Sequence, residues 1–293
     1  MSASPRWFAV APIALAGCSG GVLDPRGPVA RAEKQILFDS VGAMLLIVVP
    51  VMLATLAFAW WFRAGNSRAR YRPDWDYSGK LELLIWSVPA MIVLFLGGTG
   101  WVGAHLLDPR RAIPATAAPI EVQVVALDWK WLFLYPGQRV ATVNRLVVPA
   151  GTPIHFRLTS ATVMNSFFVP QLGSQIYAMA GMEAQLRLAA DRPGRYPGIA
   201  AHYSGKGFSD MTFTVDALPA AQFSAWVAQA RAAPPLDEAR YRQLARRGTV
   251  AQPLVFGTAP TRLFDAIVAQ RAPAAERPRD ASNQGEADAE AGQ

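Results

Sequence analysis

The chain has 293 residues, of which 52% are hydrophobic and only 17% are charged, and its mean hydropathy is +0.18. Soluble domains usually carry about 25% charged residues, so this composition argues against a wholly soluble protein and predicts a membrane-attached one with a substantial soluble part. The formal charge of +7 comes from scattered arginines, without a Lys/Arg cluster among exposed aromatic residues, and this pattern argues against a nucleic acid partner.

Residues 1–17 are predicted to be a lipoprotein signal peptide. A short positive start at Arg6 is followed by an apolar stretch, Trp7 to Ala14, that is too short to span a membrane. Next comes Leu-Ala-Gly-Cys, the pattern that precedes lipid attachment, and cleavage would leave Cys18 as a lipid-bearing N-terminus. Cys18 is the only cysteine, so no disulfide forms within the chain. An incidental cysteine in an ordinary signal or anchor is the alternative.

Residues 18–108 are predicted to hold a polar lead and a two-helix transmembrane hairpin. The lead covers residues 18–38, and two uncharged runs follow at about 40–62 and 83–107. About 20 apolar residues span a bilayer core, so each run is long enough for one crossing. In the second run, the small residues Gly97-Gly98-Thr99-Gly100 are suited to close helix packing.

The loop between the two runs indicates the orientation in the membrane. Its basic residues outnumber its acidic ones, with Arg63, Arg68, Arg70, Arg72 and Lys80 against Asp74 and Asp76. Such an excess is typical of cytoplasmic loops. A lipid-anchored N-terminus on the outer face gives the same orientation. Both signals place the two termini, and everything after about residue 108, on the periplasmic side of a bacterial inner membrane.

After a linker at residues 109–118, residues 119–217 show the pattern of short strands. Residues Ile120, Val122 and Val124 alternate with Glu121 and Gln123, which predicts a half-buried strand. The aromatic residues of WKWLFLY, Trp129 to Tyr135, share one face. Further strands are expected at Arg145–Val148, Ile154–Thr159, Asn165–Val169, Gln185–Leu188 and Met211–Val215, with turns in Asp191–Gly198. Many short strands broken by Gly and Pro predict an antiparallel sandwich.

Residues 218–270 are predicted to form a short helical extension. Residues Phe223, Trp226, Val227 and Ala230 recur at i, i+3, i+4 and i+7, the pattern of an amphipathic helix. Asp237 is a suitable cap for a second helix that ends near Gly248, and residues 262–270 suit a third. Residues 271–293 have no apolar periodicity and are predicted to be disordered.

The stretch Val163–Met211 carries a family resemblance. It contains VMNSFFVPQLGSQIYAMAGM and GIAAHYSGKGFSDM, whose spacing resembles subunit II of the haem–copper respiratory oxidases. In copper-bearing members, one His precedes a Ser-aromatic pair, and Cys-x-Glu-x-Cys-x-x-x-His-x-x-Met follows. The matching positions hold, in chain order, Asn165, Ala200, His202, Ser204, Phe208 and Met211, so only the methionine is kept. A dinuclear copper centre needs thiolates and imidazoles, so no metal is expected in this chain.

A closer resemblance, over roughly residues 15–270, is to subunit II of the cytochrome o type ubiquinol oxidases, whose members lack this copper. It rests on DWKWLFLYPGQRVATVN, TSATVMNSFFVPQLGSQIYAMAGM, YSGKGFSDM and the lipid-attachment pattern at Cys18. The resemblance implies a cupredoxin-like Greek-key sandwich in a four-subunit, proton-pumping complex that oxidises ubiquinol and reduces dioxygen to water. It also implies subunits I, III and IV and membrane lipid as partners. Haems, copper and ubiquinol are then expected in subunit I, and no redox cofactor in this chain.

Glu82 has two interpretations, which the sequence leaves open. Its segment, Glu-Leu-Leu-Ile-Trp-Ser-Val-Pro, resembles the family's Glu-x-x-x-Trp-x-x-Pro motif, whose Glu is associated with the cytoplasmic mouth of a proton pathway in subunit I. An ionisable group at a membrane boundary suits such a role. A carboxylate at the start of a helix is also stabilised by the helix dipole, which requires no function.

The remaining candidates have simpler interpretations. None of the histidines lies in a ligand pattern. We expect His105 at the membrane interface, His155 on the polar face of a strand and His202 in a loop. Solvated surface carboxylates, rather than docking charges, are expected at Glu121, Asp128 and Glu183. In copper-bearing relatives the aromatics of WKWLFLY lie near the copper and a docking face, whereas here we expect core and subunit packing.

Two other functions remain as alternatives. One is a cytochrome c oxidase subunit II with dinuclear copper, which the substituted ligand positions disfavour. The other is a free-standing cupredoxin-like lipoprotein, which the two spans and their small residues disfavour.

Overall fold

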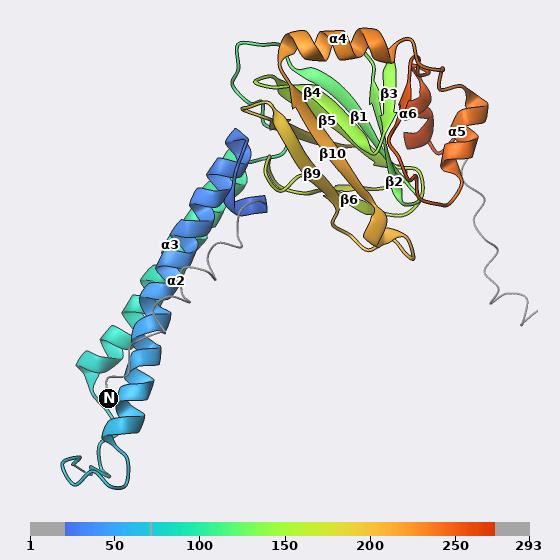
Figure 1. Ribbon diagram of the computed structural model, residues 1–293. Helices are drawn as coiled ribbons and strands as arrows, with labels where there is room; N and C mark the ends of the chain where they lie inside the picture. Colours follow the sequence, from blue (N-terminus) through green and yellow to red (C-terminus); the bar gives the residue numbers. More distant parts are fainter. Residues whose placement is uncertain (1–20, 71, 273–293) are drawn as a thin grey trace, which may run out of the picture. The chain divides into compact units, whose positions relative to one another are not determined.

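The computed structural model describes residues 21–70 and 72–272, so Cys18, the predicted signal peptide and residues 273–293 lie outside the described part (Figure 1). The chain divides into two compact units. One is a helical hairpin over residues 31–108. The other unit consists of two stretches of the chain, the segment that ends at Ala30 and the part that begins at Pro109.

The hairpin is built from two long helices, α2 (Pro28–Trp61) and α3 (Gly79–Leu106). Both are apolar and long enough to cross a membrane, which confirms the two predicted apolar helices. Helix α2 begins earlier than predicted, inside the expected polar lead. Pro28 suits the first helical position, and the residues after it, Ala-Arg-Ala-Glu-Lys-Gln, include good helix formers.

Close packing within the hairpin occurs at Gly103 and not at the predicted patch. An added Cβ at Gly103 would lie 2.9 Å from Ile36 Cδ1, so the two helices approach closely here, and a larger residue would require the Ile36 side chain to move. Added Cβ atoms at Gly97, Gly98 and Gly100 would have no neighbour within 4 Å. These three glycines therefore contact no neighbouring helix within the described part of this chain, and the packing role expected for them stays a prediction.

The segment before α2 belongs to the second unit and is hydrogen-bonded to its other residues. It begins with a 3-10 turn, η3 (Gly21–Leu23). Arg26 N donates to Gln171 O at 2.7 Å, and Asp191 N donates to Arg26 O at 2.8 Å. An added Cβ at Gly27 would lie 2.4 Å from the backbone oxygen of Ala189, so glycine is needed for this close approach.

The second unit is a β-sandwich of two sheets (Figure 1). The six-stranded sheet has the order β11-β3-β2-β1-β5-β8, and the five-stranded sheet has the order β4-β10-β9-β6-β7. The strands are β1 (Ile120–Leu127), β2 (Lys130–Tyr135), β3 (Val140–Val143), β4 (Arg145–Pro149), β5 (Pro153–Ser160), β6 (Asn165–Phe168), β7 (Ile176–Ala178), β8 (Ala184–Ala189), β9 (Gly194–Ala200), β10 (Thr212–Leu218) and β11 (Leu254–Phe256). Every predicted strand is present, which confirms the sandwich class.

Two features of the sandwich correct the sequence prediction. The prediction of an antiparallel sandwich is wrong in part, because β1 pairs with β5 and β4 pairs with β10 in parallel. The expected turn segment instead supplies much of β9, whose buried face carries Tyr196, Gly198 and Ala200. An added Cβ at Gly198 would lie 2.2 Å from the ring of Phe213. Gly198 therefore makes room for an aromatic ring of the neighbouring strand rather than for a turn.

Over β2, β3 and most of β1, the six-stranded sheet is buried on both faces. Its inner face contributes Val122, Val124, Trp131 and Phe133 to the core between the sheets. Its outer face contributes Val125, Leu127, Leu132 and Leu134 to a second core, which also contains residues of the C-terminal helices. Gln123 is only 6% exposed, so the prediction of a half-buried strand is wrong for β1.

The C-terminal extension forms α4 (Ala220–Ala230), α5 (Glu238–Ala245) and α6 (Leu263–Val268), which confirms the three predicted helices. In α4, Phe223 and Val227 are buried, and at the start of α5 Asp237 accepts a hydrogen bond from Arg240 N at 2.8 Å. The unpredicted strand β11 lies between α5 and α6 and pairs with β3. Figure 1 shows α4 along one end of the sandwich, with α5 and α6 at its side.

Candidate functional site

The positions that match copper ligands by spacing come together around Met211. Asn165, the first residue of β6, donates a hydrogen bond from Nδ2 to Met211 Sδ at 3.1 Å. Ser204 Oγ lies 3.9 Å from the same sulfur, and Ala200 N donates to Met211 O at 3.1 Å. Asn165 and Met211 are each 1% exposed. These four residues, Asn165, Ala200, Ser204 and Met211, form a largely buried group that we call the Met211 cluster.

The other two predicted positions lie at the edge of this cluster. Phe208 begins the 3-10 turn η4 (Phe208–Asp210), and its backbone oxygen accepts a hydrogen bond from Met211 N at 3.0 Å. Its ring meets Tyr203 with the centroids 5.7 Å apart. The His202 ring lies edge-on to Tyr177, with the centroids 5.9 Å apart. The ring contact of His202 is therefore with an aromatic side chain of β7.

Trp129 holds the loop that carries these residues, a role that sequence reasoning missed by placing it on a strand face. It lies in a turn before β2 with a φ of 63°, and its Nε1 donates to Ser204 O at 3.0 Å. Gly207 lies under its ring, where an added Cβ would be 2.4 Å from Trp129 Cδ2. The Gly-Lys-Gly run at 205–207 is the sequence signal for such a close approach.

The donor set of the Met211 cluster does not fit a dinuclear copper centre. Amide, methyl and hydroxyl groups stand where thiolates and imidazoles would be needed. The soft donor that is present, the Met211 sulfur, accepts the hydrogen bond from Asn165 instead. Among residues 21–70 and 72–272, no group of three or more His, Cys, Asp or Glu residues is arranged to hold a metal ion. The cluster therefore supplies packing and hydrogen bonding in place of metal coordination.

Glu82 lies in the first turn of α3. Its backbone N–H donates to Ser78 O at 2.9 Å, and its Oε2 accepts a hydrogen bond from Trp86 Nε1 at 3.1 Å. Both side chains are exposed within this chain. The Glu and Trp of the sequence motif are thus coupled on one helix face, at i and i+4, and the indole orients the carboxylate.

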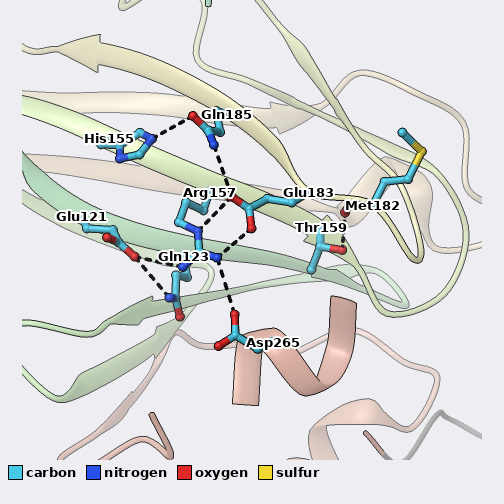
Figure 2. A network of polar contacts seen from close by, with 9 residues as sticks. All are labelled: Glu121, Gln123, His155, Arg157, Thr159, Met182, Glu183, Gln185 and Asp265. Atoms are coloured by element: carbon cyan, nitrogen blue, oxygen red, sulfur yellow. Dashed lines mark hydrogen bonds and ion pairs between the residues drawn. The ribbon is translucent and has the colours of Figure 1, made fainter. Parts of the chain in front are cut away.

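A network of polar side chains lies on the outer face of the six-stranded sheet, over β1, β5, β8 and α6 (Figure 2). Arg157 at its centre donates to Glu183 from Nε at 2.9 Å and from Nη2 at 2.7 Å. Its guanidinium also lies 3.4 Å from Glu121 and 3.5 Å from Asp265. Hydrogen bonding between the two partners raises the pKa of Arg157 and lowers the pKa of Glu183. Through Asp265, the network connects α6 to the sheet.

The three carboxylates that were expected to be solvated surface groups each lie in an ion pair. Glu121 and Glu183 pair with Arg157, while Asp128 lies 3.5 Å from Arg247 Nε with its side chain 11% exposed. Each arginine lies far from its carboxylate in the sequence, so the local sequence pattern does not predict these ion pairs. The expectation of solvated surface carboxylates is therefore wrong for Asp128, which is largely buried, whereas the Glu121 side chain is still 40% exposed.

The remaining histidines have plain surroundings, and the expected place of His105 at a membrane interface stays a prediction. His155 Nε2 is 3.4 Å from Gln185 Oε1 on the polar face of β5, and His105 at the end of α3 packs against Trp101 with the centroids 4.5 Å apart. Trp131 and Phe133 are fully buried in the core between the sheets, which confirms the core interpretation of the aromatic strand.

Comparison with known proteins agrees with this geometry. The family described as cytochrome c oxidase subunit II, periplasmic domain, matches residues 121–218, which confirms the predicted cupredoxin-like class of the sandwich. Cytochrome bo(3) ubiquinol oxidase subunit 2 of Pseudomonas putida is 47% identical over 247 residues, covering 83% of this chain and 79% of that protein. Ubiquinol oxidase subunit 2 of Acetobacter aceti is 51% identical over 234 residues, covering 79% and 76%.

A more distant likeness is found among solved structures. The periplasmic domain of subunit II of cytochrome oxidase (CoxB) of Bradyrhizobium japonicum aligns with 41% of this chain and 98% of its own length. The sequence identity is 21% and the TM-score is 0.39.

Proposed function

This chain belongs to the ubiquinol oxidase subunit 2 family and is subunit II of a ubiquinol oxidase, and from this premise we propose that its complex pumps protons while it oxidises ubiquinol and reduces dioxygen to water. Subunits I, III and IV are the proposed partners. Subunit I would hold the haems, the copper and the bound ubiquinol. Oxidation of each ubiquinol would release two electrons and two protons, and the electrons would pass to the centres of subunit I.

In this proposal the chain itself holds no redox centre. The observation that carries this point is the hydrogen bond from Asn165 to the sulfur of Met211, because it occupies the one soft donor that the copper frame retains. A site without thiolate or imidazole has no ligand set for dinuclear copper. Electrons from ubiquinol would therefore bypass this subunit, whose role is to support subunit I.

The proposed orientation places the sandwich in the periplasm. Two apolar helices, α2 and α3, are joined by a loop with an excess of arginine, which favours a cytoplasmic loop. The pattern at Cys18 favours a lipid-bearing N-terminus on the outer face. One acyl anchor alone gives only marginal attachment, so the helices would be the main anchor and the lipid an addition to them.

Glu82 is the proposed contribution of this chain to proton uptake. Its carboxylate is held by Trp86 at the start of α3, next to the basic loop, and an ionisable group at that boundary is suited to collecting protons. The helix-terminus role remains compatible with this proposal, since a carboxylate in the first turn also opposes the helix dipole.

Two other functions are less well supported. A cytochrome c oxidase subunit II with dinuclear copper requires ligands that the Met211 cluster lacks. A free-standing lipoprotein accounts for Cys18 and the sandwich, but it gives no reason for a Glu–Trp pair at the start of a second apolar helix.

The proposal is tested by isolating the complex through an affinity tag on this chain. We expect a haem protein to co-purify, ubiquinol to drive oxygen uptake, and reduced cytochrome c to fail as the electron donor. The chain separated from its partners should carry neither haem nor copper. Recovery of the chain alone would indicate a free-standing lipoprotein, and turnover with cytochrome c would indicate the copper-bearing class.

A further inference from the structure

A cavity of about 520 Å³ lies at the edge of the sandwich, between α5, the loop that follows it and β11. This volume is within the range of sites that bind small organic molecules. None of its lining residues belongs to the Met211 cluster, and the proposed oxidase function makes no use of it. The cavity therefore calls for a separate explanation.

Positive charge dominates the lining of this cavity. Four basic residues, Lys130, Arg240, Arg246 and Arg247, contribute to the wall, and no Asp or Glu does so within the described part of the chain. On α5, Arg240 is followed by Gln243 and Leu244 at i+3 and i+4, a spacing that brings all three to one helix face. The cavity thus favours a negatively charged group.

Lys130 fixes the loop that forms one wall. It is 3% exposed, and its Nζ donates to the backbone oxygens of Asp128 at 3.1 Å, Arg246 at 2.8 Å and Gly248 at 2.7 Å. Burial lowers the pKa of this ammonium, and the charge of Asp128 partly opposes that shift. All three donors are used, so Lys130 holds the 246–248 loop against the start of β2. The wall is therefore formed before any ligand arrives.

Arg246 is the cation that remains for a ligand. Arg240 donates to Pro235 O at 2.7 Å and to Asp237 at 3.1 Å. Arg247 pairs with Asp128 and lies over the ring of Trp129, 5.3 Å from its centroid. The Arg246 guanidinium, in contrast, has no hydrogen bond or ion pair within the described residues, and it lines the cavity. A planar guanidinium of this kind suits a carboxylate or a phosphate.

Apart from Gln243 and Thr249, the rest of the wall is largely apolar. Leu244 and Phe256 are buried, and Leu254 at the start of β11 is 37% exposed. Free inorganic anions gain nothing from such a surface, whereas an apolar chain or ring attached to the anion would bury area against it. We propose that this cavity binds an amphipathic anion, in which a carboxylate or phosphate head contacts Arg246 and an apolar body covers Leu254 and Phe256.

The test measures binding of octanoate to the full chain in phosphatidylcholine nanodiscs, with empty nanodiscs as the background. Equilibrium dialysis with labelled octanoate should show one saturable site per chain, with a dissociation constant on the order of 0.1 mM for a ligand of this size. Octyl phosphate should compete. Acetate lacks the apolar body and octanamide lacks the charge, so each should bind at least about tenfold more weakly.

Two variants and a matched control locate the site. Arg246→Gln should weaken octanoate binding about tenfold or more, because it removes the charge that faces the ligand. Leu254→Asn should weaken it severalfold by removing apolar surface. Arg242→Gln is the control, since this arginine lies on α5 close to Arg246, pairs with Glu238 and does not line the cavity. Both altered positions of the site are exposed, and unchanged thermal unfolding would verify that the fold is retained.

Any one of the following outcomes would overturn the inference. They are the absence of saturable binding of octanoate up to about 5 mM, equal binding by the Arg246→Gln and Arg242→Gln proteins, and equal binding of octanamide and octanoate. Acetate and inorganic phosphate that bind as tightly as octanoate would assign the site to small soluble anions. This result would contradict an amphipathic ligand. None of these measurements depends on oxidase activity.

Discussion

The side-chain amide of Asn165 donates a hydrogen bond to the thioether sulfur of Met211, with 3.1 Å between Nδ2 and Sδ. Thioether sulfur is a weak acceptor, yet a buried amide proton needs a partner, and both residues are 1% exposed. The side-chain oxygen of Asn165 accepts a hydrogen bond from Ser166 N at 3.0 Å. The residue at the first expected ligand position is therefore satisfied by the protein on both of its polar atoms.

Replacing the sulfur should destabilise the sandwich. Met211→Leu keeps a similar volume but leaves Asn165 Nδ2 without an acceptor, so the free energy of unfolding should fall by about 1–3 kcal/mol. Met182→Leu is the matched control, because Met182 is 56% exposed and its replacement should change stability by less than about 0.5 kcal/mol. Urea unfolding of the full chain in detergent, followed by tryptophan fluorescence, measures both. Equal midpoints for the two variants would show that the hydrogen bond contributes nothing.

Restoring the ligand set should create a copper site. The Met211 cluster already brings Asn165, Ala200 and Ser204 to the methionine, so the frame needs ligands and not a new fold. The quintuple variant Asn165→His, Ala200→Cys, His202→Glu, Ser204→Cys and Phe208→His should retain copper after desalting and show thiolate charge-transfer absorption.

The control for this experiment is the same variant with Ala200 left unchanged, which lacks one of the bridging thiolates. It should hold copper more weakly and lose the colour of the dinuclear centre. A colourless quintuple variant that is still folded would mean that the loop carried by Trp129 differs in shape from that of copper-bearing relatives.

Most elements of the fold were predictable because their signals are local. The stripe that includes Phe223 and Val227 identified α4, and Asp237 marked the start of α5 by capping chemistry. The burial of Gln123 was not predictable, because the second core beside it draws on α5 and α6, which lie more than a hundred residues later in the chain. Strand β9 was hidden for a related reason. Gly198 resembles a turn residue until the ring of Phe213 is placed against it.

The site was predictable only in part. The residue spacing that resembles the family identified Asn165 and Met211, but spacing alone does not predict the hydrogen bond between them. The role of Trp129 depends on a positive φ and on Gly207 beneath the indole, and the alternation of aromatic residues suggested a strand instead. The partners of Glu121 and Asp128 are set by tertiary packing, so no window of sequence reveals them.

Gly207→Ala should disturb the loop of the Met211 cluster. The added methyl would lie 2.4 Å from the Trp129 ring, so the ring or the loop must move, and the bond from Trp129 Nε1 to Ser204 O would be strained or lost. A cost of about 1–3 kcal/mol in the free energy of unfolding is expected. Gly137→Ala is the control, because an added Cβ there has no neighbour within 4 Å. Similar thermal unfolding of the two variants would contradict the tight packing of Trp129.

The pair of Arg157 and Glu183 should make stability depend on acid pH. Hydrogen bonding to Arg157 lowers the pKa of Glu183 in the folded state, so this stabilisation is fully present above the unfolded pKa, about 4.3. It is lost as the pH falls through the lowered folded value. The stability difference between the wild type and Glu183→Gln should therefore be largest near neutral pH and shrink below about pH 4.

Urea unfolding at several pH values measures this difference. Glu238→Gln serves as the control, since it removes an exposed i, i+4 pair with Arg242 that is worth less than about 0.5 kcal/mol. A difference between wild type and Glu183→Gln that stays constant from neutral to acid pH would show that the pair contributes no charge-dependent stability.

Glu82 should affect proton uptake and not the redox chemistry. If its carboxylate collects protons at the start of α3, Glu82→Gln and Glu82→Ala should slow ubiquinol oxidation and oxygen uptake while haem content and assembly stay intact. Glu82→Asp keeps the acid and shortens its reach by one methylene, so its effect should be milder. The loss should be partial, because water and neighbouring groups can bypass an entry residue at the surface.

Trp86→Phe tests the orientation of the Glu82 carboxylate separately from its presence, since it removes the hydrogen bond to Glu82 Oε2 but leaves the carboxylate and the helix start unchanged. It should slow turnover less than Glu82→Ala does. Full activity of an assembled Glu82→Ala complex would leave Glu82 only its favourable position at the helix terminus.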